Sequence, residues 1–285
     1  MNDKEYFTVI IEAEQGEEAF IQAFWAHALH LGEAIDRVSD YAYKLDIQEF
    51  KVSEADTYDF GSVPEDAIED NGIYYDSNRY YYPADEYSNF HFPYGIVPAC
   101  IKSEYGTEEI REGYSKFEDN EFKHIEIVVN KSNLLRLYLD IIEKMGRAKV
   151  VWIKIIRDWE SANTMEFYTN QDLTNVKLIE KFIKRNFENI FLNGYVSITV
   201  YYEEGETNLN LDEHKKIHLI TRSNRTFETI VAYINSCNYD FYDYNNFRKI
   251  DYRYYHWHYR PTNSIKRKDL IDELKVQGFV LWRTE

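Results

Sequence analysis

Cysteine, proline and glycine are all scarce in this 285-residue chain, and each scarcity excludes a class of protein. The two cysteines, Cys100 and Cys237, are too few for a disulfide framework and predict a reducing compartment. Eleven glycines and five prolines exclude collagen-like and linker-like sequences. No apolar run approaches the roughly 20 residues that a membrane helix needs. The first residues carry neither a basic nor an apolar stretch, so we expect no secretory signal.

Aromatic and apolar residues, by contrast, are abundant. The chain contains 26 tyrosines, 17 phenylalanines and 5 tryptophans, and 44% of its residues are hydrophobic. This content is enough for a packed core and excludes a wholly disordered chain. At about 150 residues per domain, the length predicts two domains, although one large domain fits as well. We expect a globular, cytoplasmic protein.

The net charge of −17 is unevenly distributed along the chain. Residues 1–120 contain 8 basic and 27 acidic residues, a net of −19, whereas residues 121–285 carry a net of +2. Residues 54–76 contain acidic side chains but no basic residue. A surplus of one sign confined to one region predicts a one-sided negative field, which attracts a basic partner and repels polyanions.

Tyrosines alternate with these acids from residue 58 onward. Tyrosine offers a large, rigid contact area with a hydrogen-bonding hydroxyl, and it is enriched at protein interfaces. We therefore predict a docking surface for Arg- and Lys-rich proteins. Its expected residues are Asp56, Tyr58, Asp59, Glu65, Asp66, Glu69, Asp70, Tyr74, Tyr75, Asp76, Tyr80 and Tyr81. The alternative interpretation is that the acids serve only to keep the protein dissolved.

Hydrophobic periodicity predicts regular structure along most of the chain. Strands are expected over 6–14, 47–52, 122–129, 149–156, 165–168, 195–202, 216–221, 249–259 and 279–283. Helices are expected over 17–31, 34–44, 132–145, 174–191, 226–237 and 264–276. A hairpin turn is expected at Ser77-Asn78, between short strands at 73–76 and 79–82.

The recurrent strand-helix-strand order favours the α+β class, with mixed or mainly antiparallel sheets and helices packed on them. Charge and composition both change near residue 120. We therefore expect an acidic, Tyr-rich α+β region over residues 1–120 and a near-neutral α+β domain over residues 121–285. One continuous domain with an acidic insertion would give the same pattern.

Motifs of the common catalytic chemistries are missing from the sequence. It contains no HExxH or CxxC metal pattern, no GxSxG nucleophile turn, and no GxGxxG or GxxxxGK[ST] phosphate loop. We accordingly predict no cofactor. The alternative of an enzyme with dispersed catalytic residues stays open, but no local sequence pattern argues for one.

Two histidines near the C-terminal end, His256 and His258, are the candidates for a chemical site. On a strand they would share one face, and two histidines with a carboxylate can bind a metal. No carboxylate partner follows from local spacing, so packing of an edge strand is the favoured interpretation. His27 and His30, three residues apart on the expected first helix, form a second pair that lacks further ligands at metal-binding intervals.

The region around the C-terminal histidines is also basic. Residues 248–268 carry seven basic side chains and one acidic side chain, interleaved with tyrosine and tryptophan. Such a combination can bind phosphate backbones and stack on bases. The pI of about 5.0 argues against a nucleic-acid binder. We expect this segment to pair with the acidic region or to form a contact in a homodimer.

The profile of this sequence resembles that of the bacterial immunity proteins of polymorphic-toxin systems. It combines an α+β pattern, an expected reducing compartment, absent catalytic motifs and localised acidity. The resemblance implies a non-enzymatic inhibitor that occludes the basic active site of a cognate toxin, with carboxylates meeting phosphate-binding Lys and Arg. The alternative function is a hydrolase or transferase with His256 and His258 at its centre.

Overall fold

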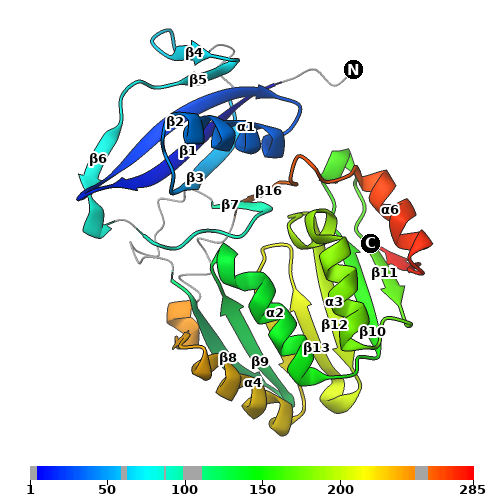
Figure 1. The fold of residues 1–285 in the computed structure, drawn as a ribbon. Helices are drawn as coiled ribbons and strands as arrows, with labels where there is room; N and C mark the ends of the chain where they lie inside the picture. Colours follow the sequence, from blue (N-terminus) through cyan, green and yellow to red (C-terminus); the bar gives the residue numbers. More distant parts are fainter. Residues whose placement is uncertain (1–4, 59–62, 87, 99–110, 248–255) are drawn as a thin grey trace.

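Two large sheets, each with helices on one face, organise the computed structural model (Figure 1). The structure describes residues 5–58, 63–86, 88–98, 111–247 and 256–285. It confirms the expected α+β class, because strand pairing in the described residues is antiparallel with one parallel exception. No helix in these ranges is long and apolar enough to cross a membrane.

The smaller sheet is built from the N-terminal part of the chain. Its elements are β1 (Glu5–Gln15), β2 (Glu18–Ala28), α1 (Leu31–Lys44), β3 (Phe50–Thr57), β4 (Ile68–Asp70), β5 (Ile73–Tyr75) and β6 (Tyr80–Pro83). The strands of this part lie in the order β3-β1-β2-β5-β4, and β6 also pairs with β2. The strands β5 and β6 therefore follow one another along the same edge of β2.

The helix expected over residues 17–31 is wrong, because β2 occupies this segment. Phe20 and Phe24, on which the helical reading depended, lie four residues apart, and this spacing fits a strand as well as a helix. The long pairing of β2 with β1 decides between them, since it runs without a break from Glu5↔Ala28 to Gln15↔Glu18. Tertiary pairing thus overrides the local periodicity.

The hairpin expected at Ser77-Asn78 is also wrong. β5 and β6 do not pair with each other; each pairs with β2. The hairpin of this segment instead joins β4 to β5 through Asn71 and Gly72, whose φ angles are +53° and +70°. Asn-Gly is the dipeptide that most readily adopts two consecutive positive φ angles, so this turn was readable from the sequence.

The larger sheet is formed by the C-terminal part of the chain. Its elements, with two strands that lie beside it, are β7 (Ile96–Pro98), β8 (Gly113–Asp119), β9 (Phe122–Val128), α2 (Lys131–Met145), β10 (Val150–Ile155), β11 (Glu166–Asn170), α3 (Val176–Arg185), β12 (Val196–Tyr202), β13 (Thr207–Leu211), β14 (Ile217–Thr221), α4 (Asn224–Ser236), β15 (Asp240–Phe241), β16 (His256–His258), α6 (Arg267–Val276) and β17 (Val280–Thr284). Among the described strands the order is β15-β8-β9-β14-β13-β12-β10-β11-β17.

Most elements expected in this part are confirmed, with shifted ends. The helix expected to reach residue 191 ends at Arg185 and is followed by a π-helical turn over Phe187–Phe191. The strands β7, β8, β13 and β15 were not expected. Much of the strand expected over 249–259 lies outside the described residues, and β16 is its described end.

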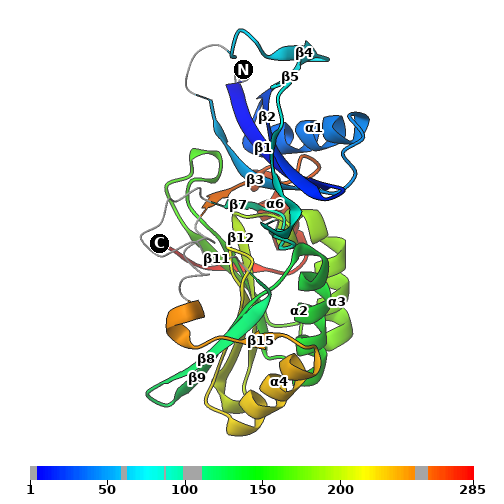
Figure 2. The same cartoon turned by 90° about the vertical axis from the view of Figure 1, so that its left-hand side faces the viewer.

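Each large sheet buries one face under its own helices. In the smaller sheet, Val9 packs with Val38 of α1 in a shared core. In the larger sheet, Ile153 belongs to one buried core with Tyr138 of α2 and Ile230 of α4. Figure 2 shows α1, α2 and α3 on the same side of the molecule, and the opposite face of the smaller sheet carries none of the described helices.

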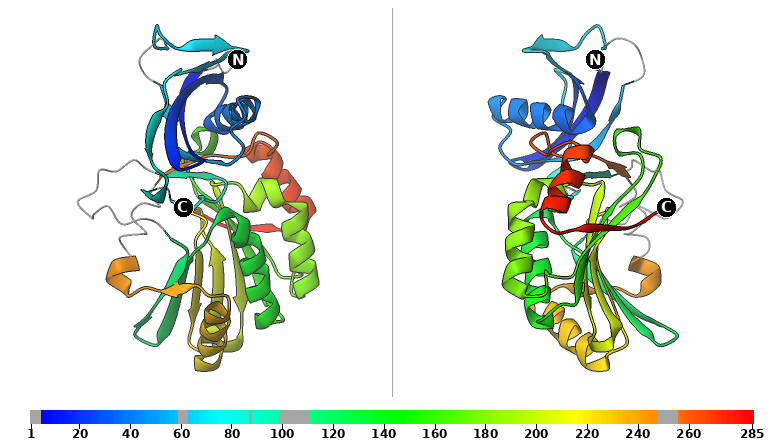
Figure 3. Two further views of the ribbon diagram at one scale, coloured as in Figure 1. Left: turned by 60° about the vertical axis from the view of Figure 1, so that its left-hand side comes forward. Right: turned by 90° about the vertical axis from the view of Figure 1, so that its right-hand side faces the viewer.

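A boundary near residue 120 was expected between the two parts. The structure pairs β8 with β9 over Gly113↔Val128 to Asp119↔Phe122, so the larger sheet already includes residues 113–119. The chain also returns to the smaller part near its C-terminal end, because Tyr259 belongs to the core of the smaller sheet. The two-stranded sheet of β7 and β16 lies between the two large sheets (Figures 1 and 3).

Candidate functional site

One face of the smaller sheet is half-exposed, and we call this face, opposite α1, the open face. The sequence of β1 specifies it by strict alternation: Phe7, Val9 and Ile11 are buried, whereas Tyr6 and Thr8 are half-buried. Successive side chains of a strand point to opposite faces, so Tyr6 and Thr8 project away from the core.

A continuous row of directly paired residues crosses the open face. Asp56 of β3 pairs with Thr8 of β1, which pairs with Trp25 of β2. Trp25 pairs with Tyr74 of β5, and Tyr74 pairs with Glu69 of β4. Directly opposed residues of an antiparallel sheet share a face. The register therefore brings three predicted residues, Asp56, Glu69 and Tyr74, onto one surface.

Aromatic rings fill the space between the acids of this row. The ring of Tyr58 lies edge-on to Trp25 at 6.2 Å, and that of Tyr6 lies edge-on to Tyr74 at 6.0 Å. Tyr6 also stacks on His27 at 4.8 Å. Trp25 is 8% exposed, and its indole N–H has no hydrogen-bond partner in the described part of the chain. The open face is thus a packed aromatic surface with carboxylates at both ends of the row.

Further along the same face, β6 adds exposed tyrosine. Tyr80 of β6 and Glu12 of β1 both pair with Ile21 of β2, from opposite sides. The side chain of Tyr80 is 65% exposed. Tyr82, two residues on, donates a hydrogen bond to the Glu12 carboxylate. Glu12 also forms an ion pair with Lys51 at 3.0 Å. The acid at this end of the open face is therefore partly neutralised within the sheet.

Three of the predicted residues point instead to the α1 side of the sheet. The Asp70 carboxylate accepts a hydrogen bond from the Tyr41 hydroxyl of α1 at 3.0 Å. Tyr75 stacks on Phe24 at 6.1 Å, and Tyr81 lies 5.8 Å from the ring of Phe20. These residues support the fold of the sheet rather than its open face.

Three further predicted residues lie in loops. Glu65 and Asp66 are exposed in the turn before β4. The Asp76 carboxylate accepts hydrogen bonds from the backbone N–H of Asn78 at 2.8 Å and from its side-chain amide at 3.0 Å, so it stabilises the link between β5 and β6. Asp59 lies outside the described residues.

The basic C-terminal segment does not neutralise the open face in the ranges that the structure describes. Arg267 forms its ion pair with Glu166 of β11 at 2.9 Å, and Arg260 donates to the carbonyl of Ser264 at 2.7 Å. No ion pair of the described residues includes Asp56 or Glu69. Residues 248–255, with three of the basic side chains, lie outside the described part.

Sequence reasoning missed three residues of the open face: Tyr6, Trp25 and Glu12. The alternation of β1 was a sufficient signal for Tyr6 and Glu12, because it places them on the face opposite Phe7 and Val9. Trp25 was missed because its segment was read as a helix, in which it would have no defined relation to Tyr74.

The histidine candidates lie elsewhere, between the two large sheets. The His258 ring lies 5.2 Å from that of His214 and 5.9 Å from that of Tyr195. Burial, with His214 as a second cause, lowers the pKa of His258 to about 4, so its imidazole is neutral at pH 7. Among the described residues no group of three or more His, Cys, Asp or Glu could hold a metal ion. The side chain of His256 is not among those described.

His258 also lines a cavity of about 580 Å³ between the two parts of the chain. The cavity is shared with His30, Tyr195 and Arg260. Burial lowers the pKa of His30, with Arg260 as the second cause, and burial raises the pKa of Tyr195. Perturbed groups around a cavity are a feature of catalytic sites, although structural burial has the same effect.

A buried charged segment adjoins these histidines. The Asp212 carboxylate accepts hydrogen bonds from the backbone N–H of Lys216 at 2.8 Å and from His218 at 3.0 Å. Burial opposes ionisation of Asp212, but the hydrogen bonds from His214 and His218 hold its pKa well below the usual range. Lys215 is fully buried and donates to two backbone carbonyls, and burial lowers its pKa to about 7.

Comparison with known proteins adds no relative to this description. No family model matches the chain, and neither a curated protein nor a solved structure matches it.

Proposed function

We propose that the protein is a non-enzymatic binding protein that docks a basic protein through the open face of its smaller sheet. One observation carries the proposal: Asp56 and Glu69 flank a packed row of aromatic rings and take part in no ion pair of the described residues. Rigid rings supply contact area, and carboxylates that take part in no ion pair of the described residues supply attraction for Arg and Lys.

The position of the face suits this role. α1 covers the other side of the sheet, so the open face can be approached without disturbing the core. The acidic surplus of residues 1–120 adds a long-range field that accelerates encounter with a cation-rich partner. The partner we propose is a basic protein such as a cognate toxin, which the immunity-type inhibitor would neutralise by covering its cationic active site.

Binding to the protein encoded beside this one tests the proposal, since an inhibitor of this kind is expected beside its toxin. We expect a basic neighbour to co-purify in a fixed ratio, and the double variant Asp56→Asn/Glu69→Gln to bind it at least about tenfold more weakly. The matched control is Glu228→Gln/Glu273→Gln, which removes two exposed carboxylates from α4 and α6. Equal losses in both variants, or no binding by any basic neighbour, would contradict the proposal.

A hydrolase or transferase at His258 is the second candidate function. The observation that favours it is the cavity in which His30, Tyr195 and His258, all with shifted pKa values, lie together. A stoichiometric divalent ion, or turnover of a phosphoester or carboxylester panel, that is lost in His258→Ala would support it. Full retention of any such activity in this variant would exclude His258 as its centre.

A further inference from the structure

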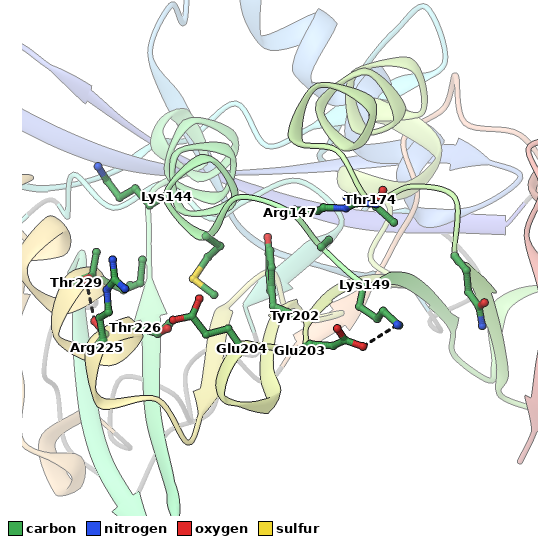
Figure 4. Close-up of a pocket in the computed structure, with 14 residues that line it drawn as sticks. Lys144, Arg147, Lys149, Thr174, Tyr202, Glu203, Glu204, Arg225, Thr226 and Thr229 are labelled. Carbon is green, nitrogen blue, oxygen red and sulfur yellow. Dashed lines mark hydrogen bonds and ion pairs between the residues drawn. The ribbon is translucent and has the colours of Figure 1, made fainter.

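A second cavity, of about 660 Å³, lies at the end of the larger sheet that is remote from the smaller sheet (Figure 1). Figure 4 shows the side chains that line it. Its walls come from the end of α2, the residues before β10, the end of β12 and the first turns of α4. We call it the cationic cavity, because Lys144, Arg147, Lys149 and Arg225 line it against Glu203 and Glu204.

Three of these cations, Lys144, Arg147 and Arg225, have no acidic partner in the described part of the chain. Lys149 forms an ion pair with Glu203 at 2.7 Å, and the Lys144 ammonium lies 4.1 Å above the ring of Tyr233. The guanidinium groups of Arg147 and Arg225 enter none of the ion pairs or hydrogen bonds of the described residues. Arginine presents a planar fork of donors that matches the oxygens of a phosphate group.

Tyr202 gives an independent indication of a ligand. Its side chain is 2% exposed, it lines the cavity, and its hydroxyl has no hydrogen-bond partner among the described residues. Burial raises the pKa of this phenol, so it stays a neutral donor. An unpaired buried hydroxyl costs stability, which a ligand oxygen would restore. Figure 4 shows Tyr202 between Lys144 and Arg225 on one side and Arg147 and Lys149 on the other.

The wall that carries Glu203 and Glu204 is fixed to the start of α4. Gly205 has a φ of +62°, and a Cβ on it would lie 2.4 Å from the Cβ of Ser223. The Gly205 carbonyl accepts from the backbone N–H of Arg222 at 2.7 Å, and the Ser223 hydroxyl caps α4 by accepting from Thr226 N at 3.1 Å. The positive end of the α4 dipole is therefore held at the cavity, where it favours an anion.

We propose that the cationic cavity binds the phosphate group of a small organic phosphate. Arg147 and Arg225 contact the phosphate oxygens, and the Tyr202 hydroxyl donates to one of them. The volume is that of a pocket for a small organic molecule and exceeds what inorganic phosphate fills. Met145, which also lines the cavity, contacts the organic part, and its flexible side chain adjusts to it. This site is independent of the open face.

Titration of the purified full chain tests the proposal, with isothermal calorimetry and phosphorus NMR line broadening as the two readouts. The probes are inorganic phosphate, ribose 5-phosphate, glycerol 3-phosphate and adenosine 5′-monophosphate. We expect wild-type protein to bind at least one ester more tightly than inorganic phosphate. The double variant Arg147→Gln/Arg225→Gln should lose at least about tenfold in affinity. The control Arg185→Gln, which removes an exposed arginine of α3, should bind as wild type does.

Three results would each overturn the proposal. The first is the absence of binding by wild-type protein for all four probes, and the second is equal affinity in wild type and the double variant. A third result, that no ester binds more tightly than inorganic phosphate, would equally exclude the cavity as a site for an organic phosphate.

Tyr202→Phe separates a binding role of the hydroxyl from a structural one. Because the hydroxyl has no partner to lose, we expect the melting temperature without ligand to stay equal or rise. With ligand, we expect affinity to fall about fivefold or more. An unchanged affinity would remove Tyr202 from the site, and a lower melting temperature without ligand would show that its hydroxyl serves the fold.

Discussion

The two large sheets differ in whether the charged side chains on the face without helices are neutralised by neighbouring residues. On the larger sheet, Lys154 of β10 forms an ion pair with Glu213 at 2.7 Å, and His218 of β14 bonds to Asp212 at 3.0 Å. On the smaller sheet, Asp56 and Glu69 have no such partner among the described residues. A region of balanced composition can pair its charges internally, whereas a region with surplus acid must leave some of them for an outside partner or for solvent.

The largest expected effect tests whether the two sheets are separate folding units. Ile153→Ala and Ile11→Ala each remove a fully buried side chain, one from each core, and should each cost about 3 kcal/mol. If the units are independent, calorimetry will show two unfolding transitions, and each variant will lower only the transition temperature of the sheet that carries the substitution. A single transition lowered equally by both variants would mean that the two sheets unfold together.

Lys215 in the larger part gives the next largest effect, which depends on pH. Its pKa is lowered from 10.5 to about 7 in the folded protein, so between pH 7 and 10.5 the unfolded chain binds the proton that the folded protein has lost. The free energy of unfolding therefore rises with pH in this window. We expect wild type to gain about 2 kcal/mol over Lys215→Met between pH 7 and pH 9, measured by urea denaturation. A pH-independent difference would contradict the lowered pKa.

The turn between β4 and β5 in the smaller sheet gives a moderate effect. Gly72 has a φ of +70°, which a residue with a Cβ adopts at a cost, so Gly72→Ala should lose about 1 kcal/mol of stability. Gly16→Ala, with the same φ of +70° in the turn before β2, is the matched comparison. A neutral Gly72→Ala would mean that β4 contributes little to the stability of the sheet.

The smallest expected effect sharpens the contrast in charge. Because Asp56 and Glu69 make no ion pair in the described residues, Asp56→Asn/Glu69→Gln should change the stability of the protein alone by less than about 0.5 kcal/mol. Lys154→Met, which leaves the partly buried Glu213 without its ion pair, should cost more. The reverse order in chemical denaturation would show that the acids of the open face are structural.

Much of the larger sheet could be predicted from sequence, whereas part of the smaller one could not. The runs that became β10 and β12 are apolar and bounded by charge or glycine, so their burial is locally encoded. The prediction for the β2 segment was wrong because the spacing of Phe20 and Phe24 fits two periodicities, and only pairing with β1 decides between them. The strand β13 was not predicted because asparagine alternates with leucine in a short segment whose strand structure depends on its neighbours.

The candidate sites follow the same division. Twelve residues were predicted for docking from their type and closeness in sequence, but the register of the sheet places Asp56, Glu69 and Tyr74 on the open face and Asp70, Tyr75 and Tyr81 on the other. Closeness in sequence cannot separate these groups, because neighbouring strand residues point in opposite directions. The cationic cavity was not predicted, since its residues come from four distant segments.

By itself the chain determined its class, its acidic first part and most of its buried strands, because composition and local periodicity act over a few residues. Only the tertiary structure decided which acids and rings share a face, which cations meet around Tyr202, and where His258 lies. These arrangements depend on strand register and on contacts between residues far apart in the sequence, such as Thr8 with Asp56 and Lys149 with Glu203. The free energy of such contacts comes from the packing of the whole chain rather than from any one segment.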